Sequence, residues 1–420
     1  MTAEPSTPRH DPYAVLRVRD FRLLLIGRFL SSLGAEMLTF AIAWQLWLRT
    51  HSALALGMVG LVQVVPVILL SLPSGHFADQ HNRRRIIILT QSVFVLCAIG
   101  LAILSWTVGP ILVVYGVLLV IGITRALNDP ASSTLTPQTV PPELFANAAT
   151  WGSSAWQLAA ISGPALAGIW VAAAGSVTWL YVFDACVNSV YVVLLTMIRG
   201  RPIALARKAA TLDSLKEGLR FMRRTKIILA AITLDMFAVL FGGAVALLPI
   251  YATDILKVGP TGLGIMRAAP SVGALIMAVL LAHLPPFKKA GKTLLWAVTG
   301  FGLATIVFGV SRIFVLSVLM LVLLGALDNI SVVIRSTLML TRVPDQMRGR
   351  IASVNSIFIS MSNELGTFES GLLASLVGPV IAVWGGGIGT ILVVAVVARV
   401  FPDMRRLKSV APDSQQAAEK

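Results

Sequence analysis

Charged residues are scarce in this sequence. They make up 13% of the 420 residues, whereas hydrophobic residues make up 56%. Soluble domains carry about 25% charged residues, so this chain cannot cover itself with a water-facing surface. The few charges are mostly basic, and the formal net charge is +15. In a soluble protein such an excess would indicate a nucleic-acid partner, but the low total charge indicates a membrane protein instead.

Cysteine and histidine are also rare, with 2 and 5 residues. Cys97 and Cys186 lie inside apolar runs, so no disulfide framework is predicted. The histidines stand mostly near expected loops, and we therefore predict no metal site. The motifs His-Glu-x-x-His, Gly-x-Ser-x-Gly and Gly-x-x-x-x-Gly-Lys do not occur, which argues against an intramembrane hydrolase and an ATP-driven pump. We expect no enzyme, no cofactor and no nucleic-acid partner.

Long apolar runs are what the chain has in abundance. A helix needs about 20 predominantly apolar residues to cross a bilayer. We predict twelve such spans, near residues 21–47, 54–75, 86–106, 110–131, 145–173, 177–198, 227–251, 261–284, 293–310, 313–336, 350–376 and 378–401. Between the sixth and seventh, charged residues alternate with leucines at helical spacing, which predicts an amphipathic helix on the membrane surface.

An internal repeat divides the chain into two halves. An offset of 203 residues pairs Gly122 with Gly325, and an offset of 204 pairs Arg84-Arg85 with Lys288-Lys289. Two related halves with a site between them at the midplane are typical of secondary transporters. The predicted fold class is an all-α membrane protein with two pseudo-symmetric six-helix bundles. Its parts are a cytoplasmic tail at 1–20, a bundle at 21–198, a cytoplasmic linker at 199–226, a bundle at 227–401 and a cytoplasmic tail at 402–420.

Basic residues collect in alternate predicted loops. One set of loops holds Arg83–Arg85 and the clusters at 199–226 and 288–292, whereas the other set holds only Arg49, Lys257 and Arg312. Cytoplasmic loops are the ones that carry excess Lys and Arg. We therefore expect both termini in the cytoplasm, lipid around the spans, and a monomer.

The loop after the second span carries a recognisable pattern, Gly-x-x-Ala-Asp-x-x-x-Arg-Arg, from Gly75 to Arg84. It resembles the signature of the major facilitator superfamily, roughly Gly-x-x-Ala-Asp-Arg-x-Gly-Arg-Arg. Gln80 replaces an arginine and Asn82 a glycine. Because Asn tolerates a positive φ better than other non-glycine residues, the turn is expected to survive the change. The resemblance implies a transporter whose cytoplasmic gate contains Gly75, Asp79, Arg83, Arg84 and Asp129.

Within this gate we hypothesise two contacts. Asp79 would face the N-terminal end of the eleventh span near Gly349–Ile351, where a helix dipole stabilises a carboxylate. Arg83 would reach Asp129 on the fourth span.

Two further stretches resemble exporters of the superfamily. Gly163, Pro164 and Gly168 in the fifth span are similar to the exporters' Gly-Pro-x-x-Gly-Gly core, in which proline bends the helix and small residues admit a neighbour. The runs Arg28-Phe29 and Val343-Pro344-Asp345 resemble drug and siderophore exporters related to macrolide-efflux and enterobactin-export proteins. This implies a bacterial-type inner (cytoplasmic) membrane.

Ionisable residues inside spans are costly, so each is a functional candidate. Arg28, Ser32 and Glu36 share one helix face, which suggests a stripe along a cavity. Arg125 and Asp129 are one turn apart and could pair, while Asp184 is expected at the membrane interface. Arg267 corresponds to Gln63 in the repeat, so one half has gained a cation. The candidates for proton coupling or the substrate cavity are Glu36, Arg28, Arg125, Asp235, Asp328 and Glu364.

The leading prediction is a secondary exporter of an amphipathic small organic molecule, of drug or siderophore type, by proton antiport through alternating access. The proton gradient would be its energy source. We hypothesise Glu36 as the proton carrier and Glu364 as its rival. A flippase for lysophospholipids or other lipids is an alternative with the same fold, and a non-transporting membrane receptor is an alternative of another class.

Overall fold

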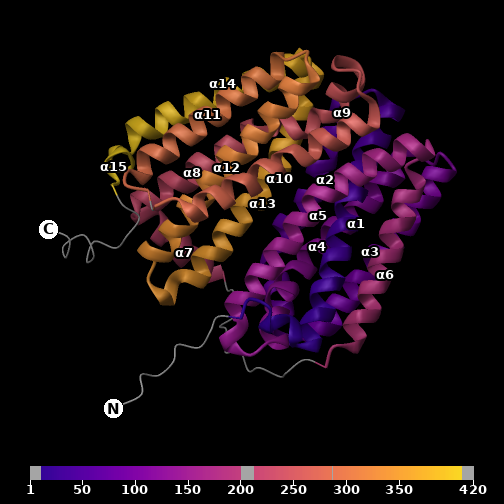
Figure 1. Ribbon diagram of the computed structural model, residues 1–420, viewed down its shortest axis with the longest axis horizontal. Coiled ribbons are helices and arrows are strands. Elements are labelled where there is room, and N and C mark those ends of the chain that lie inside the picture. Colours follow the sequence, from indigo (N-terminus) through magenta and orange to yellow (C-terminus); the bar gives the residue numbers. More distant parts are fainter. Residues whose placement is uncertain (1–10, 200–211, 286, 409–420) are drawn as a thin grey trace.

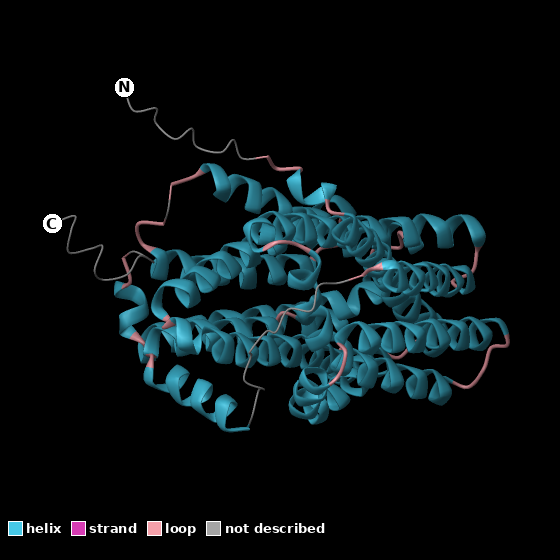
Figure 2. Ribbon diagram, turned by 90° about the horizontal axis from the view of Figure 1, so that it is seen from below, coloured by secondary structure: helices cyan, strands magenta, loops and turns pink. Residues whose placement is uncertain are grey.

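The computed structural model describes residues 11–199, 212–285 and 287–408, and the regular elements within these ranges are all helices (Figures 1 and 2). The first half holds α1 (Arg19–Thr50), α2 (Ala53–Gln80), α3 (Arg83–Trp106), α4 (Ile111–Thr139), α5 (Phe145–Ala174) and α6 (Thr178–Met197). Short 3-10 turns precede α1, at Ala14–Arg17, and α5, at Pro142–Leu144.

The second half begins with α7 (Leu212–Arg224), which lies in the predicted amphipathic segment. Its seventh span is assembled from α8 (Lys226–Phe241), a 3-10 turn (Gly243–Leu247), α9 (Leu248–Ile250) and a π-helical turn (Tyr251–Ile255). The remaining helices are α10 (Gly259–His283), α11 (Ala290–Val310), α12 (Phe314–Arg342), α13 (Asp345–Val377), α14 (Pro379–Val400) and the short α15 (Pro402–Arg406).

Eleven of the described segments are long and apolar enough to cross a membrane. The remaining predicted span, the eleventh in order, is α13, which has 33 residues but is interrupted by polar groups such as Asn363, Glu364 and Glu369. It nevertheless runs along α2, α8 and α14, as a spanning helix of the bundle does. The prediction of twelve helices in two bundles is confirmed. The tails at 1–10 and 409–420, and the linker residues 200–211, lie outside the described residues.

The turn between α2 and α3 survives the replacement of glycine by Asn82, but for a different reason from the one expected. Asn82 has φ −65°, so no left-handed conformation is used. Its side chain instead accepts hydrogen bonds from the backbone N–H groups of Arg84 and Arg85. Asn82 is therefore the N-cap of α3, a position that asparagine favours strongly.

The two halves share a core at only one end. We call the ends of the spans near residues 50–53 and 255–259 the outer end, and those near 80–83 and 224–226 the inner end. At the outer end one hydrophobic cluster joins both halves and includes Phe40 and Trp44 of α1 with Leu248 and Met266 of the second half. At the inner end, separate clusters serve the first half and the second half.

Glycines bring the two halves together along two seams. In α2 and α13, Gly57 packs against Gly371, and in α5 and α10, Gly168 packs against Gly264. A Cβ atom on any of these four glycines would clash with backbone atoms of the facing helix. Figure 1 shows the halves converging near α9 and separating toward α7. The structure is therefore closed at the outer end.

Candidate functional site

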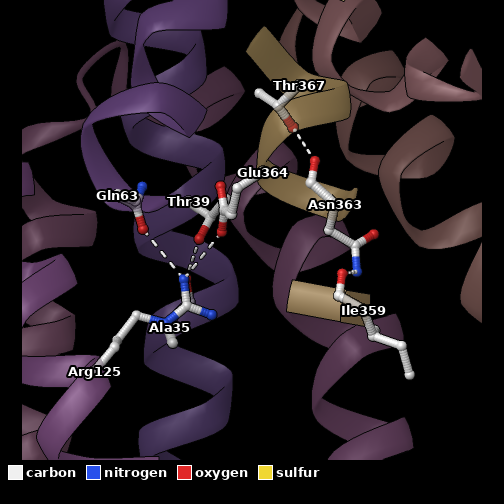
Figure 3. A network of polar contacts seen from close by, with 8 residues as sticks. All are labelled: Ala35, Thr39, Gln63, Arg125, Ile359, Asn363, Glu364 and Thr367. Carbon is white, nitrogen blue, oxygen red and sulfur yellow. Dashed lines mark hydrogen bonds and ion pairs between the residues drawn. The ribbon is translucent and has the colours of Figure 1, made fainter. Parts of the chain in front are cut away.

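An ion pair joins the two halves in the middle of the spans. Arg125 of α4 lies with its Nη1 atom 3.4 Å from Oε1 of Glu364 on α13. The same Nη1 donates a hydrogen bond of 3.1 Å to Gln63 Oε1 on α2, as Figure 3 shows. The side chains of Arg125 and Glu364 are 49% and 24% exposed. Charged groups at this depth are rare unless they face the bundle interior or a water-filled cavity.

Two glycines place these three side chains side by side. A Cβ atom on Gly60 would clash with the carbonyl oxygen of Glu364, so only glycine lets α13 approach α2 this closely. A Cβ on Gly122 would lie 2.9 Å from the carbonyl oxygen of Gln63, so glycine at this position of α4 likewise lets α4 pack closely against α2. The sequence marked Arg125 and Glu364 as candidates, but it did not indicate that Arg125 also bonds to Gln63.

Glu36 lies beside this pair. It lies within electrostatic range of Arg267 on α10 and of Arg125. Arg267 crosses between the halves, since its Nη1 donates a hydrogen bond of 3.1 Å to the backbone carbonyl of Thr39 on α1. The four charged residues therefore alternate in sign in the order Arg267, Glu36, Arg125 and Glu364. Arg267 and Glu364 come from the second half, and the other two come from the first.

The Gly-Pro motif of α5 contributes to this site by shape. A Cβ atom added to Gly163 would lie 2.6 Å from Cβ of Glu36. The absence of a side chain at Gly163 therefore leaves room for the side chain of Glu36. Pro164 and Gly168 contact Gly264 of α10 through backbone atoms. The motif therefore packs α5 against both α1 and α10, which carry two of the four charges.

The predicted stripe from Arg28 to Glu36 is only partly realised. Arg28 donates to Thr136 Oγ1 at 2.7 Å and to the backbone carbonyl of Ser132, so it ties α1 to α4 within the first half. These contacts hold the Arg28 guanidinium against α4, and its role in proton coupling or the substrate cavity stays a prediction. Asp184, which is expected at the membrane interface, packs inside the protein, and its depth in the membrane stays a prediction. It is only 4% exposed and accepts a 2.9 Å hydrogen bond from Asn188.

The second half has an internal ion pair of its own. Arg335 of α12 lies 2.5 Å from Asp235 of α8, and both side chains are 7% exposed. Asp328 is within electrostatic range of both. Nε of Arg335 has no hydrogen-bond partner among the described residues. Sequence reasoning named both aspartates and missed Arg335, which corresponds to Ser132 at the repeat offset of 203.

The gate predicted from the loop signature is described in part. Arg84 donates from Nε to the carbonyl of Leu195 at 2.8 Å, and so ties α3 to the end of α6. The backbones of Gly75 and Asp79 belong to the last turns of α2, but the side chain of Asp79 lies outside the described ones. The contacts proposed for Asp79 and Arg83 therefore stay predictions. Asp129 lies within electrostatic range of Arg125, whose ion-pair partner is Glu364.

The described side chains at these charges form no metal centre. Among the described residues, no group of three or more His, Cys, Asp or Glu side chains could hold a metal ion. A cavity of about 1090 Å³ lies between α3 and α6, next to Trp106 and Trp179. None of the four alternating charges lines it, so we do not place a substrate there.

Comparisons with known proteins place this geometry in context. The family model described as transmembrane secretion effector matches residues 10–419. The enterobactin exporter EntS of Escherichia coli O1:K1 is 24% identical over 393 residues, which are 93% of this chain and 94% of that exporter. The enterobactin exporter of Shigella boydii serotype 18 matches with the same identity and coverage.

Solved structures of transporters share the fold. A POT family transporter in complex with 5-aminolevulinic acid has a TM-score of 0.71 at 12% identity, with 92% of this chain and 96% of that chain covered. A bacterial homologue of the iron transporter ferroportin in an inward-facing state has a TM-score of 0.66 at 19% identity, with coverages of 93% and 99%. At such identities the likeness concerns the fold alone.

Proposed function

This chain belongs to the transmembrane secretion effector family of the major facilitator superfamily, and we propose that it exports an amphipathic small organic molecule by proton antiport. It is a multi-pass membrane transporter related to the enterobactin exporter. The observation that carries the proposal is the Arg125–Glu364 pair, which is partly exposed and joins the two halves at mid-span.

Alternating access requires that contacts between the halves break and form again. The Arg125–Glu364 pair and the bond from Arg267 to the Thr39 carbonyl cross between the halves, and both must break before the outer end opens. Substrate entering from the inner end would replace these partners with its own polar groups. The halves can then part at the outer end without leaving the charges unpaired.

Antiport follows if proton and substrate compete for the same carboxylates. At the outer side a proton on Glu364 or Glu36 removes the negative charge that holds the substrate's polar groups, and the substrate leaves. At the inner side the carboxylate gives up its proton and pairs with its guanidinium again. One charge moved across 100 mV corresponds to about 2.3 kcal/mol, which supports roughly a fifty-fold concentration ratio. The proton gradient suffices as energy source, without a cofactor.

The direction of export depends on the orientation of the chain. The inner end carries Arg83–Arg85 and the exposed cations of α7, whereas few basic residues stand at the outer end. Cytoplasmic loops carry the excess of basic residues. We infer that the inner end faces the cytoplasm and that both termini lie there, in a bacterial-type inner membrane.

The test is flux in proteoliposomes under an imposed pH gradient. Suitable probes are a catecholate, a lipophilic cation and a fluorescent lysophospholipid, so that drug-type export, siderophore-type export and lipid flipping are distinguished. We expect Glu364→Gln to keep probe exchange and to lose uphill accumulation. Glu369→Gln is the matched control, because Glu369 is on the same helix and, among the described residues, its side chain accepts a hydrogen bond only from the neighbouring Ser370.

Three outcomes would change the proposal. If Glu364→Gln still releases protons with the probe and Glu36→Gln does not, the proton carrier is Glu36. If both variants still couple, the carrier lies elsewhere, with Asp235 and Asp328 next in line. If the wild-type protein moves none of the probes in either direction but binds one of them, a receptor replaces the exporter.

A further inference from the structure

Helix α7 presents a row of four cations away from the protein. Lys216, Arg220, Arg223 and Arg224 are all exposed. At 3.6 residues per turn they fall within an arc of roughly 100° around the helix axis. No hydrogen bond or ion pair joins any of the four to another described residue. We call these residues the basic stripe of α7.

The opposite face of α7 is fixed to α13. Gly218 and Met222 are buried on that face, and a Cβ on Gly218 would lie 3.2 Å from Cγ2 of Val354. Met222 belongs to a hydrophobic cluster that also holds Ile351 and Val354 of α13. An ion pair between Glu217 and Arg350 lies at the edge of this contact. Because the Gly218 and Met222 face of α7 packs against α13, the basic stripe on the opposite face points away from α13.

The position of α7 along the membrane normal follows from the chain. The helix ends at Arg224, and the span that contains α8 begins at Lys226, two residues later. The last turn of α7 must therefore lie at the boundary between membrane and water. Leu219, which is 38% exposed, flanks the stripe and provides an apolar group at the same level. An amphipathic helix with basic and apolar groups at this depth suits a surface of anionic lipids.

We propose that the basic stripe of α7 binds the headgroups of anionic phospholipids in the leaflet at the inner end. Four cations in one row, without ion-pair partners among the described residues, complement the phosphates of an anionic leaflet. The Glu217–Arg350 pair and the Gly218 contact connect this surface to the inner end of α13, the helix that carries Glu364. Lipid bound to α7 therefore holds the inner end of α13 in the position described here.

Competition between lipids tests the binding site in the full-length protein. The purified protein is mixed with phosphatidylglycerol and phosphatidylcholine in detergent, and bound lipids are counted by native mass spectrometry. We expect a preference for phosphatidylglycerol that falls about fivefold for each cation removed. The variant Arg220→Gln/Arg223→Gln/Arg224→Gln should lose most of it. The variant Lys288→Gln/Lys289→Gln/Lys292→Gln, which removes the same charge from the end of the α10–α11 loop and the first turn of α11, should keep it.

Several results would overturn the proposal. An equal loss in both triple variants means that overall charge, and not the stripe, attracts the lipid. Displacement of phosphatidylglycerol by inorganic phosphate alone assigns the stripe to a soluble anion. Hydrogen exchange across residues 345–356 should be slower with phosphatidylglycerol than with phosphatidylcholine, and an unchanged rate refutes the link to α13. None of these measurements involves transport, so their failure leaves the proposed export untouched.

Discussion

The seam between α2 and α13 offers a sharp test of alternating access. A Cβ atom on Gly371 would lie 2.5 Å from Cα and 2.6 Å from N of Gly57, and 2.7 Å from the carbonyl oxygen of Ala53. All three are backbone atoms, so no side-chain rotation can relieve the clash. In Gly371→Ala the two helices must therefore move apart wherever the outer end is closed.

The expected size of the effect follows from the cost of overpacking. Adding a methyl group to a tightly packed site typically costs about 1–3 kcal/mol. If the helices separate at this seam in the outward-open state, the cost falls only on the closed state. The equilibrium then shifts toward the outward-open state by a factor of roughly 5–150. The substitution acts on the balance between two states and leaves each half intact.

Cysteine labelling measures this shift. Thr367 lies beside Gly60 in the same seam, so Thr367→Cys reports opening at the outer end. In a background without Cys97 and Cys186, an impermeant maleimide should label this cysteine faster when Gly371→Ala is added. Gly385→Ala is the control, because a Cβ there meets nothing within 4 Å. Unchanged labelling in a Gly371→Ala protein with normal thermal stability would refute the reasoning about this seam.

Other predictions concern single contacts. Arg335→Met leaves Asp235 buried without its partner and should lower the free energy of unfolding by about 3–5 kcal/mol; adding Asp235→Leu should recover much of this in a thermal-shift assay, and no recovery would contradict an isolated pair. If Glu36 carries the proton, Gly163→Ala, whose added methyl group displaces Glu36, should lower proton release per exported molecule, and unchanged release would contradict a role for this contact. In intact cells, Lys257→Cys should react with an impermeant thiol reagent and Lys288→Cys should not; the reverse pattern would invert the proposed orientation.

Much of the fold could be predicted because it depends on local patterns. Apolar runs of spanning length locate the helices, since the bilayer excludes any backbone whose polar groups are not paired internally. The weakest apolar signal among the predicted spans belongs to α13, where polar residues interrupt the run because this helix lies between the halves and carries Glu364. This weak signal coincides with the candidate site.

The pairing of charges could not be predicted in the same way. Arg125 and Asp129 are one turn apart on α4, which made them plausible partners, yet Arg125 pairs with Glu364, 239 residues away. Spacing along a sequence relates residues on one helix, whereas the partner of a buried charge depends on which neighbouring helix faces it.

By itself, the sequence determined that this protein spans a membrane in two related halves, and it identified the ionisable residues of the candidate site, although it missed Arg335. Hydrophobic length and basic asymmetry are sufficient for this, because insertion responds to local composition. Only the tertiary structure decided that Arg28 is held within the first half, that Asp184 is buried, and that Gly163 makes room for Glu36. These outcomes depend on how closely two helices approach, and that distance is determined by the small residues of both helices together.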